Sequence, residues 1–317
     1  MKEIHISKET SNLIKGAACL LIVVHHFCSW LDGKGYDGFL IDFIGSRGGV
    51  LGVTIFFFLS AWGLSESQNN NRYPFMLFAK RRLSKIYFPL IITNILFYFF
   101  WLYFKQKRFN LVSFLLTSLN LKFYDGALWF CNTILVFYIF FYLAFIPNLK
   151  WVKVLLCLFF TVLYSVVVTL LYPTKPFYVY GIIGFPFGMV LSQYKKILLK
   201  YSHWVPWCCI TILSLIVGAR LVSSFDNLFL MNIYSLIVLV VLVAITQKVN
   251  ISKKLIILPF LGTYSYEIYL LHDKFLIPMG RTGYLLWYPA AFILLVLPLA
   301  ILLKSCSKTI YDRWSNN

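Results

Sequence analysis

The stretch GGVLGVTIFFFLSAWGL, residues 48–64, carries no charged side chain and decides the class of the fold. A helix needs about 20 mainly apolar residues to cross a bilayer, and this run forms the centre of such a segment. The rest of the chain has a similar character, because 60% of its 317 residues are hydrophobic and only 13% are charged. A soluble domain carries about 25% charge. The composition therefore excludes an ordinary soluble protein and indicates a lipid-embedded one.

Ten apolar segments are long enough to span a membrane, and short loops join them. We predict an all-α fold: a polytopic transmembrane bundle of about ten helices, forming a single domain over residues 1–317 with no separate soluble domain. No small-residue cleavage site follows the first segment, so we expect a membrane span there and not a cleaved signal peptide. The predicted spans are 12–31, 44–65, 86–104, 126–146, 151–172, 177–194, 203–222, 228–247, 257–277 and 284–304.

The formal net charge is +18, from 29 basic and 11 acidic residues. In a soluble protein this excess would suggest nucleic acid, but basic loops of a membrane protein face anionic lipid and fix the topology, so we expect no nucleic-acid partner. Of the 29 basic residues, 19 fall on one side of the ten-span topology and 10 on the other. The positive-inside rule then predicts a multi-pass protein of the cell (plasma or inner) membrane with both termini in the cytoplasm.

The first span contains ionisable groups that lipid penalises. A charge at mid-bilayer costs about 2.5–3.5 kcal/mol on insertion scales, so such residues indicate function by default. Lys15 and His26 are eleven residues apart, which places them on one helix face about 16 Å apart along the axis, whereas His25 points elsewhere. This stripe favours a channel for a long ligand with an anionic end. The alternative is a snorkelling lysine and a histidine bonded to a carbonyl.

The segment KRRLSK, residues 80–85, places four cations before the third span. It acts either as a signal that sets the topology or as a binding site for phosphates, for which Arg has a suitable forked geometry. We call these four residues the basic cluster, and they are Lys80, Arg81, Arg82 and Lys85.

The ninth span contains Glu267, His272 and Asp273 in an otherwise apolar segment. A lone polar residue in a bundle is often a helix–helix hydrogen bond, but several in one span favour a cavity. Trp129 and Asn132 open the fourth span near the outer face, where we expect them to bind a substrate that approaches the histidine.

These segments, in order along nearly the whole chain, resemble the acyltransferase type 3 family of bacterial membrane O-acyltransferases. The spacing Lys15–x10–His26 is similar to the family's first-span Arg–x10–His, with lysine in place of arginine. Lys80 and Arg82 occupy the positions of its Arg-x-Arg motif, and Ala61 stands in the glycine position of its FFFLSG motif. Further similar segments are LWFCNTILVFY, GFPFGMVLSQYKK and LGTYSYEIYLLH.

The resemblance implies transfer of an acyl group, usually acetyl, from cytoplasmic acyl-coenzyme A to a hydroxyl of a cell-envelope glycan or lipid-linked saccharide. Lys15 and the basic cluster would hold the coenzyme. His26 would be the catalytic histidine, either as a base toward the hydroxyl or as an acylated nucleophile. His272 and Glu267 would orient the acceptor or His26.

Two other classes of function remain open at this point. The same polar stripe would suit a transporter or flippase of a glycan or lipid, although we find no internal sequence symmetry of the kind such proteins carry. A non-catalytic partner in an envelope assembly complex is the second alternative. The seven cysteines form no C-x-x-C pair, so we expect no metal site and no disulfide framework. The sequence is compatible with a homo-oligomer and does not define the oligomeric state.

Overall fold

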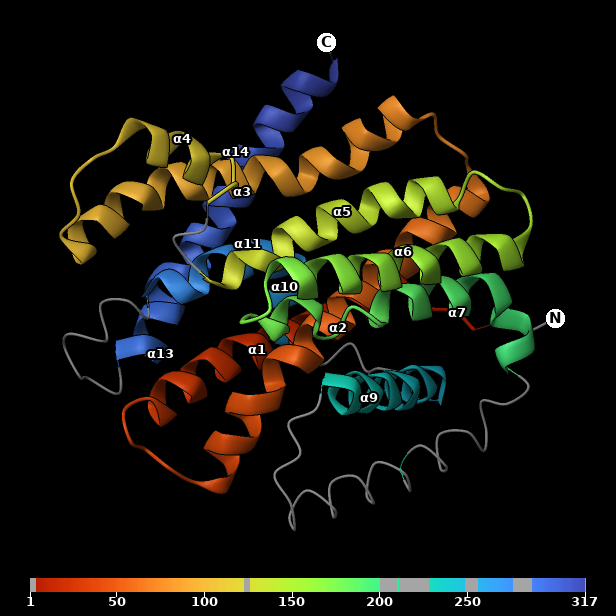
Figure 1. The fold of residues 1–317 in the computed structure, drawn as a ribbon, viewed down its shortest axis with the longest axis horizontal. Helices are drawn as coiled ribbons and strands as arrows, with labels where there is room; N and C mark the ends of the chain where they lie inside the picture. The colour runs from red at the N-terminus through yellow and green to blue at the C-terminus, as the bar shows by residue number, and fades with distance from the viewer. Residues whose placement is uncertain are drawn as a thin grey trace. The chain divides into compact units, whose positions relative to one another are not determined.

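The computed structural model describes residues 4–122, 126–199, 210, 228–248, 256–275 and 287–316, and every regular element within these ranges is a helix (Figure 1). The all-helical fold class is therefore confirmed for the described residues. The elements are α1 (Lys8–Asp32), α2 (Phe39–Asn70), α3 (Phe75–Lys105), α4 (Leu111–Ser118), η1 (Gly126–Leu128), α5 (Trp129–Ala144), α6 (Lys150–Leu171), η2 (Pro176–Val179), α7 (Gly184–Leu199), α9 (Leu228–Lys248), α10 (Ile257–Thr263), α11 (Ser265–Leu271), η3 (His272–Phe275), α13 (Trp287–Ala291), the π-helix η4 (Phe292–Val296) and α14 (Leu297–Asn316).

Seven helices of the described part are long and apolar enough to cross a membrane, which supports a multi-pass membrane protein. The count of ten spans, the side on which the termini lie and the single domain stay predictions. The seven helices coincide with predicted spans 12–31, 44–65, 86–104, 126–146, 151–172, 228–247 and 284–304.

The other three predicted spans differ from simple long helices or fall outside the described residues. Span 177–194 contains part of η2 and most of α7, which is only 16 residues long. Span 203–222 lies outside the described residues except for position 210. Span 257–277 is broken, because α10 ends at Thr263 and α11 begins at Ser265. Residues 276 and 277 of this span lie outside the described residues, so the span itself stays a prediction. Irregular backbone at membrane depth is tolerated only where protein buries it or where it lines a water-filled cavity, and hydropathy does not reveal such a break.

The chain divides into two compact units, which we describe separately. Unit 1 comprises Met1–Ile22, Ser46–Arg72 and Ile139–Thr263. Unit 2 comprises Val23–Gly45, Tyr73–Tyr138 and Tyr264–Asn317. The helices α1, α2 and α5 each run from one unit into the other.

In unit 1, α2 and α7 approach at backbone distance because α7 begins with the small-residue pattern Gly184-x-x-x-Gly188. A methyl group at Gly184 would overlap the carbonyl oxygen of Thr54, and one at Gly188 would overlap that of Phe58. Helices in lipid associate through such close packing, because the hydrophobic effect gives little net attraction between them.

Close packing of glycine against backbone also joins α1 to α10. A methyl group at Gly16 would overlap the backbone of Leu258, and one at Gly262 would overlap the backbone of Asn12. Each helix thus presents its glycine to the backbone of the other, and this contact fixes the part of α1 that carries Lys15.

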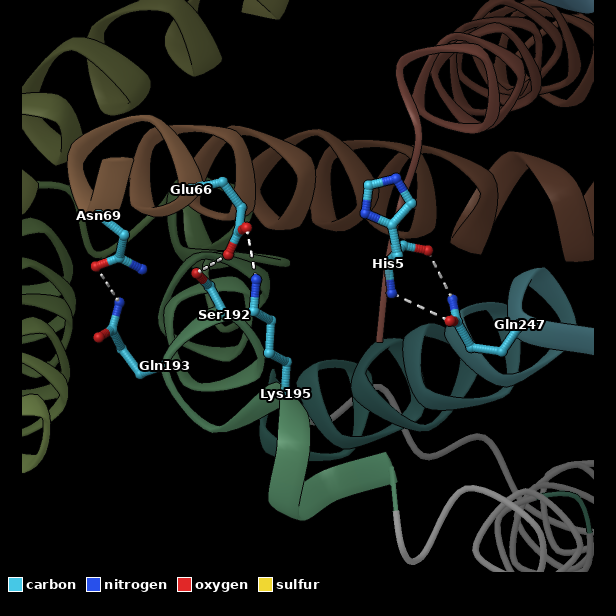
Figure 2. A network of polar contacts seen from close by, with 7 residues as sticks. All are labelled: His5, Glu66, Asn69, Ser192, Gln193, Lys195 and Gln247. Atoms are coloured by element: carbon cyan, nitrogen blue, oxygen red, sulfur yellow. Dashed lines mark hydrogen bonds and ion pairs between the residues drawn. The ribbon is translucent and has the colours of Figure 1, made fainter. Parts of the chain in front are cut away.

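Polar side chains connect α2 and α7 near their C-terminal ends (Figure 2). The carboxylate of Glu66 accepts hydrogen bonds from Ser192 Oγ at 2.6 Å and from Lys195 Nζ at 2.9 Å. Gln193 Nε2 donates to Asn69 Oδ1 at 3.4 Å. This network adds directional contacts to an interface that otherwise depends on glycine packing.

The segment before α1 is held against α9 (Figure 2). The backbone N–H of His5 donates to Gln247 Oε1 at 3.1 Å, and its carbonyl accepts from Gln247 Nε2 at 3.0 Å. Ile4 and Ile6 on either side are buried in the apolar core of unit 1. The side chain of His5 itself is exposed.

Unit 2 is built on α3, which packs against α14, while α11 packs against both (Figure 1). Two tyrosines fix the rotation of α11. The hydroxyl of Tyr266 donates to the carbonyl of Ile86 at 2.8 Å, and that of Tyr269 donates to the carbonyl of Ala127. Because both bonds end on the backbone of neighbouring elements, they hold the face of α11 that leads to His272.

We predict that Gly188→Ala destabilises the protein by about 1–3 kcal/mol, the usual cost of overpacking, because the added methyl meets backbone that cannot move aside. Thermal unfolding in detergent measures the effect. Gly63→Ala is the matched control on α2: no atom lies within 4 Å of its added methyl, so it should be neutral or stabilising. Equal melting temperatures for Gly188→Ala and the wild type would contradict the close packing.

Candidate active site

Two histidines from distant parts of the sequence meet in unit 2. His26 lies in the C-terminal half of α1, and His272 begins η3 directly after α11. Their ring centroids are 5.0 Å apart with the ring planes at 52°. His272 is fully buried, and His26 is partly buried. Of the residues predicted to act in catalysis, the structure therefore brings together His26 and His272.

The hydrogen bonds of His272 define its tautomer. Its Nδ1 lies 2.7 Å from the carbonyl oxygen of Tyr269, which can only accept, so Nδ1 carries the proton and Nε2 is an acceptor. Among the described residues, none forms a hydrogen bond with that Nε2. The pair thus contains a buried acceptor that a bound ligand or a proton on His26 could satisfy.

His25 has a different role from His26. Its Nδ1 lies 3.0 Å from the carbonyl of Ile44, the arrangement expected of a histidine that stabilises helix packing. Its ring meets that of His26 edge-on, with centroids 4.9 Å apart. The prediction that the two adjacent histidines point in different directions agrees with these separate contacts.

Sequence reasoning missed Lys274 as a site residue, because the ten-span topology placed it among the loop cations. Its side chain is 1% exposed, which is rare for lysine. Lys274 and Asp273 both interact electrostatically with the imidazole of His26. A charge within a predicted span is the signal that could have found it.

Glu267 is not paired with the histidines. Its Oε2 lies 3.6 Å from Nζ of Lys304 on α14, and the same ammonium lies 5.2 Å from the centre of the Tyr264 ring. The Glu267 side chain is 8% exposed and that of Lys304 is 40% exposed. The acid that lipid would penalise most thus has a cation partner, which the sequence did not indicate.

The basic cluster lies on the first turns of α3 and contacts aromatic rings. Nζ of Lys80 is 5.1 Å from the ring centre of Trp314, and Nζ of Lys85 is 5.2 Å from that of Tyr311. Cζ of Arg81 lies 4.6 Å from the ring centre of Tyr73. At these distances each cation is attracted by the face of its ring. Arg82 is the fourth member of the cluster and is partly buried.

Lys15 lies on α1, eleven residues before His26, and the helix between them is continuous. The common face and the axial separation of about 16 Å stay predictions. Lys15 belongs to unit 1 and His26 to unit 2. A role for Lys15 in binding a coenzyme stays a prediction.

The two residues predicted to bind substrate lie at the start of α5. Asn132 has its amide engaged: Oδ1 accepts from Asn120 Nδ2 at 2.7 Å, and Nδ2 donates to the carbonyl of Asn120 at 3.0 Å. Asn94 Nδ2 in turn donates to Asn120 Oδ1 at 3.2 Å. Trp129 is partly buried and meets Phe130 edge-on. Asn132 thus has a structural role in helix packing, and substrate binding by either residue stays a prediction.

The comparison with protein families decides the kind of protein. The model of the acyltransferase 3 family, described as an acyltransferase domain, matches residues 9–305. The chain belongs to the acyltransferase 3 family. Searches of curated proteins and of solved structures found no match. Membership of this acyltransferase family confirms the resemblance read from the motifs and supports membrane acyltransferase activity. Among the described residues, no three His, Cys, Asp or Glu side chains are grouped so that they could hold a metal ion.

We predict that Glu267→Gln lowers both stability and activity, because it leaves Lys304 without its carboxylate partner. Replacing one member of a partly buried ion pair costs more free energy than replacing both members with uncharged residues. The double variant Glu267→Gln/Lys304→Met should then recover much of the loss. Thermal unfolding and acyl transfer measure the two effects.

The pair Glu66–Lys195 in unit 1 provides the matched control, since it is an ion pair away from the histidines. Glu66→Gln/Lys195→Met should leave acyl transfer unchanged. If the Glu267 double variant regains stability but no activity, the Glu267 carboxylate or the Lys304 ammonium acts in catalysis in addition to forming the pair.

Proposed function

We propose that this protein is a membrane O-acyltransferase that moves an acyl group, usually acetyl, from cytoplasmic acyl-coenzyme A to a hydroxyl of a cell-envelope glycan or lipid-linked saccharide. The observation that carries the proposal is the pairing of His26 with the buried His272 inside a chain of the acyltransferase 3 family. A sugar hydroxyl is a poor nucleophile at neutral pH and needs a base within reach, for which histidine is the commonest side chain.

The donor would enter from the basic cluster. Coenzyme A carries phosphates at one end of a long, thin arm and a thioester at the other. Lys80 lies six residues before Ile86 on α3, and the bond from Tyr266 to Ile86 fixes the level of α11 beside it. His272 lies six residues after Tyr266. At 1.5 Å per residue, the six residues from Lys80 to Ile86 and the six from Tyr266 to His272 together span up to about 18 Å along the helices. A long arm such as that of coenzyme A could then place its thioester near the histidines while its phosphates stay at the basic cluster.

The reaction at the histidine pair would proceed without a metal. In direct transfer, His26 takes the proton of the acceptor hydroxyl while the hydroxyl oxygen attacks the thioester carbonyl carbon. The C–S bond then breaks, and the departing thiolate receives that proton as coenzyme A leaves. In the alternative route, a ring nitrogen of His26 attacks the thioester carbonyl carbon, the C–S bond breaks, and coenzyme A leaves as the thiol with a proton from that imidazole. The acceptor hydroxyl then attacks the acyl group on His26, the C–N bond breaks, and the imidazole takes the hydroxyl proton. Both routes form an oxyanion, and the buried side chain of Lys274 is the hydrogen-bond donor that would stabilise it.

Further residues would support this chemistry. His272, with an acceptor Nε2, would orient His26 or the acceptor, and Lys15 would hold an anionic part of the donor. Trp129 would stack on a sugar ring at the acceptor side. The low exposure of His272 and Lys274 would keep water from the thioester.

The location follows from the charge distribution. The excess of basic residues in alternate loops supports a multi-pass protein of the cell membrane with both termini in the cytoplasm. The donor and the acceptor would then approach the histidines from opposite faces of the bilayer.

A transporter or flippase of a glycan or lipid is the second candidate, and one observation favours it. The ninth span is interrupted at Tyr264, and discontinuous helices line the substrate sites of many transporters. Release of free thiol from acetyl-coenzyme A by the purified protein, on addition of acceptor, supports the enzyme. Movement of acceptor across a vesicle membrane without thiol release supports the transporter.

We predict that His26→Ala lowers acyl transfer by about 10²- to 10⁴-fold, the usual contribution of a general base, while the protein still folds. Thiol release in detergent and acylation of the cell-surface glycan measure it. His5→Ala is the matched control, because the side chain of His5 is exposed and only its backbone contacts Gln247. Near-normal transfer by a folded His26→Ala variant would overturn the proposed function.

A further inference from the structure

The last turns of α14 contact the basic cluster through two aromatic residues that no sequence motif singled out. Nζ of Lys80 lies 5.1 Å from the ring centre of Trp314, and Nζ of Lys85 lies 5.2 Å from that of Tyr311. Phe88 meets the Trp314 ring edge-on, with centroids 5.7 Å apart and planes at 90°. All five residues belong to unit 2. A cation within about 6 Å of an aromatic face is attracted by the ring, so both lysines are held from α14.

We propose that Trp314 and Tyr311 complete the nucleotide end of the donor site. Trp314 stacks on the adenine of acyl-coenzyme A, and Tyr311 positions Lys85 for the phosphates. This inference rests on the proposed function, because it assumes that the basic cluster binds acyl-coenzyme A.

The chemistry of the ligand matches the arrangement. The coenzyme ends in a purine next to several phosphates, and proteins bind such groups with aromatic faces beside cations that follow the phosphates. Trp314 is 45% exposed, so a large part of its ring remains accessible beside Lys80 and Phe88. An exposed tryptophan among cations therefore offers a stacking surface where the phosphates would be bound.

The other charges near this surface leave it cationic. Arg81 lies over the ring of Tyr73, and Arg82 is the next residue of α3. On α14, Lys308 and Arg313 are exposed, and the carboxylate of Asp312 interacts electrostatically with Lys85. A bound phosphate would compete with Asp312 for Lys85, and Tyr311 would keep the ammonium in reach of both.

Two donors separate stacking from charge. Acetyl-coenzyme A contains the adenine, whereas S-acetyl-4′-phosphopantetheine has the same arm, thioester and first phosphate but lacks the adenosine and the two phosphates attached to it. We expect Trp314→Ala to weaken binding of acetyl-coenzyme A by about tenfold or more, the size of one base–aromatic stack, and to leave binding of the truncated donor within about twofold. Calorimetry on the full-length protein in detergent measures both.

Conservative variants and a distant tryptophan complete the design. Trp314→Phe keeps an aromatic face and should retain most of the affinity. Tyr311→Ala should weaken binding of both donors, whereas Tyr311→Phe should not. Trp151→Ala on α6 of unit 1 is the matched control, because Trp151 is 57% exposed and belongs to the other unit.

The outcomes distinguish this inference from the function on which it rests. If the wild type binds acetyl-coenzyme A and Trp314→Ala binds it equally well, the inference is overturned and the proposed function stands. An equal loss for both donors would overturn the adenine stack as well, because the tryptophan would then act only through Lys80. Absence of binding by the wild type would overturn both proposals.

Discussion

The hydrocarbon of a bilayer offers no hydrogen bonds, and this constraint governs how unit 2 is built. A buried polar side chain there gains from a partner within the protein, and several of these partners come from other elements. Glu267 meets Lys304, Asn120 bonds to Asn94 and Asn132, and the tyrosines of α11 bond to backbone carbonyls of α3 and η1. The two tyrosine bonds and the pair of Glu267 with Lys304 hold both the depth and the rotation of α11. The position of His272 follows from them, because it is the first residue after α11.

Close backbone packing provides the corresponding constraint in unit 1. The glycines of α7 and α10 allow neighbouring helices to approach without side chains between them. Gly16 is the residue after Lys15, so the close contact of α1 with α10 limits how that part of α1 can rotate or slide.

The sequence predicted the seven helices that are long enough to cross a membrane and singled out His26 and His272, whose roles stay predictions. It failed where pairing between helices decides. Hydropathy is a property of one segment, so α1, α2 and α3 followed from it directly. The partnership of Glu267 with Lys304 depends on the relative rotation of α11 and α14, which no local pattern encodes. Lys274 was missed because a cation near the end of a span looks the same in sequence whether it faces solvent or lies buried. The break at Tyr264 was missed because apolar residues continue on both sides of it.

Two of the irregular backbone segments in the described part lie on either side of His272 along the chain. The break at Tyr264 precedes it, and the π-helix η4 follows residues 276–286, which are outside the described part. A π-helix places an extra residue in a turn and is frequent at functional sites because it redirects neighbouring side chains. An enzyme that draws a donor from one face of a membrane and an acceptor from the other needs a sealed centre with an opening toward each side. Regular helices seal a bundle well, whereas interrupted ones leave polar backbone that a substrate or water can satisfy. We therefore expect the openings of this acyltransferase to follow the interruptions, with the histidine pair in the closed region between them.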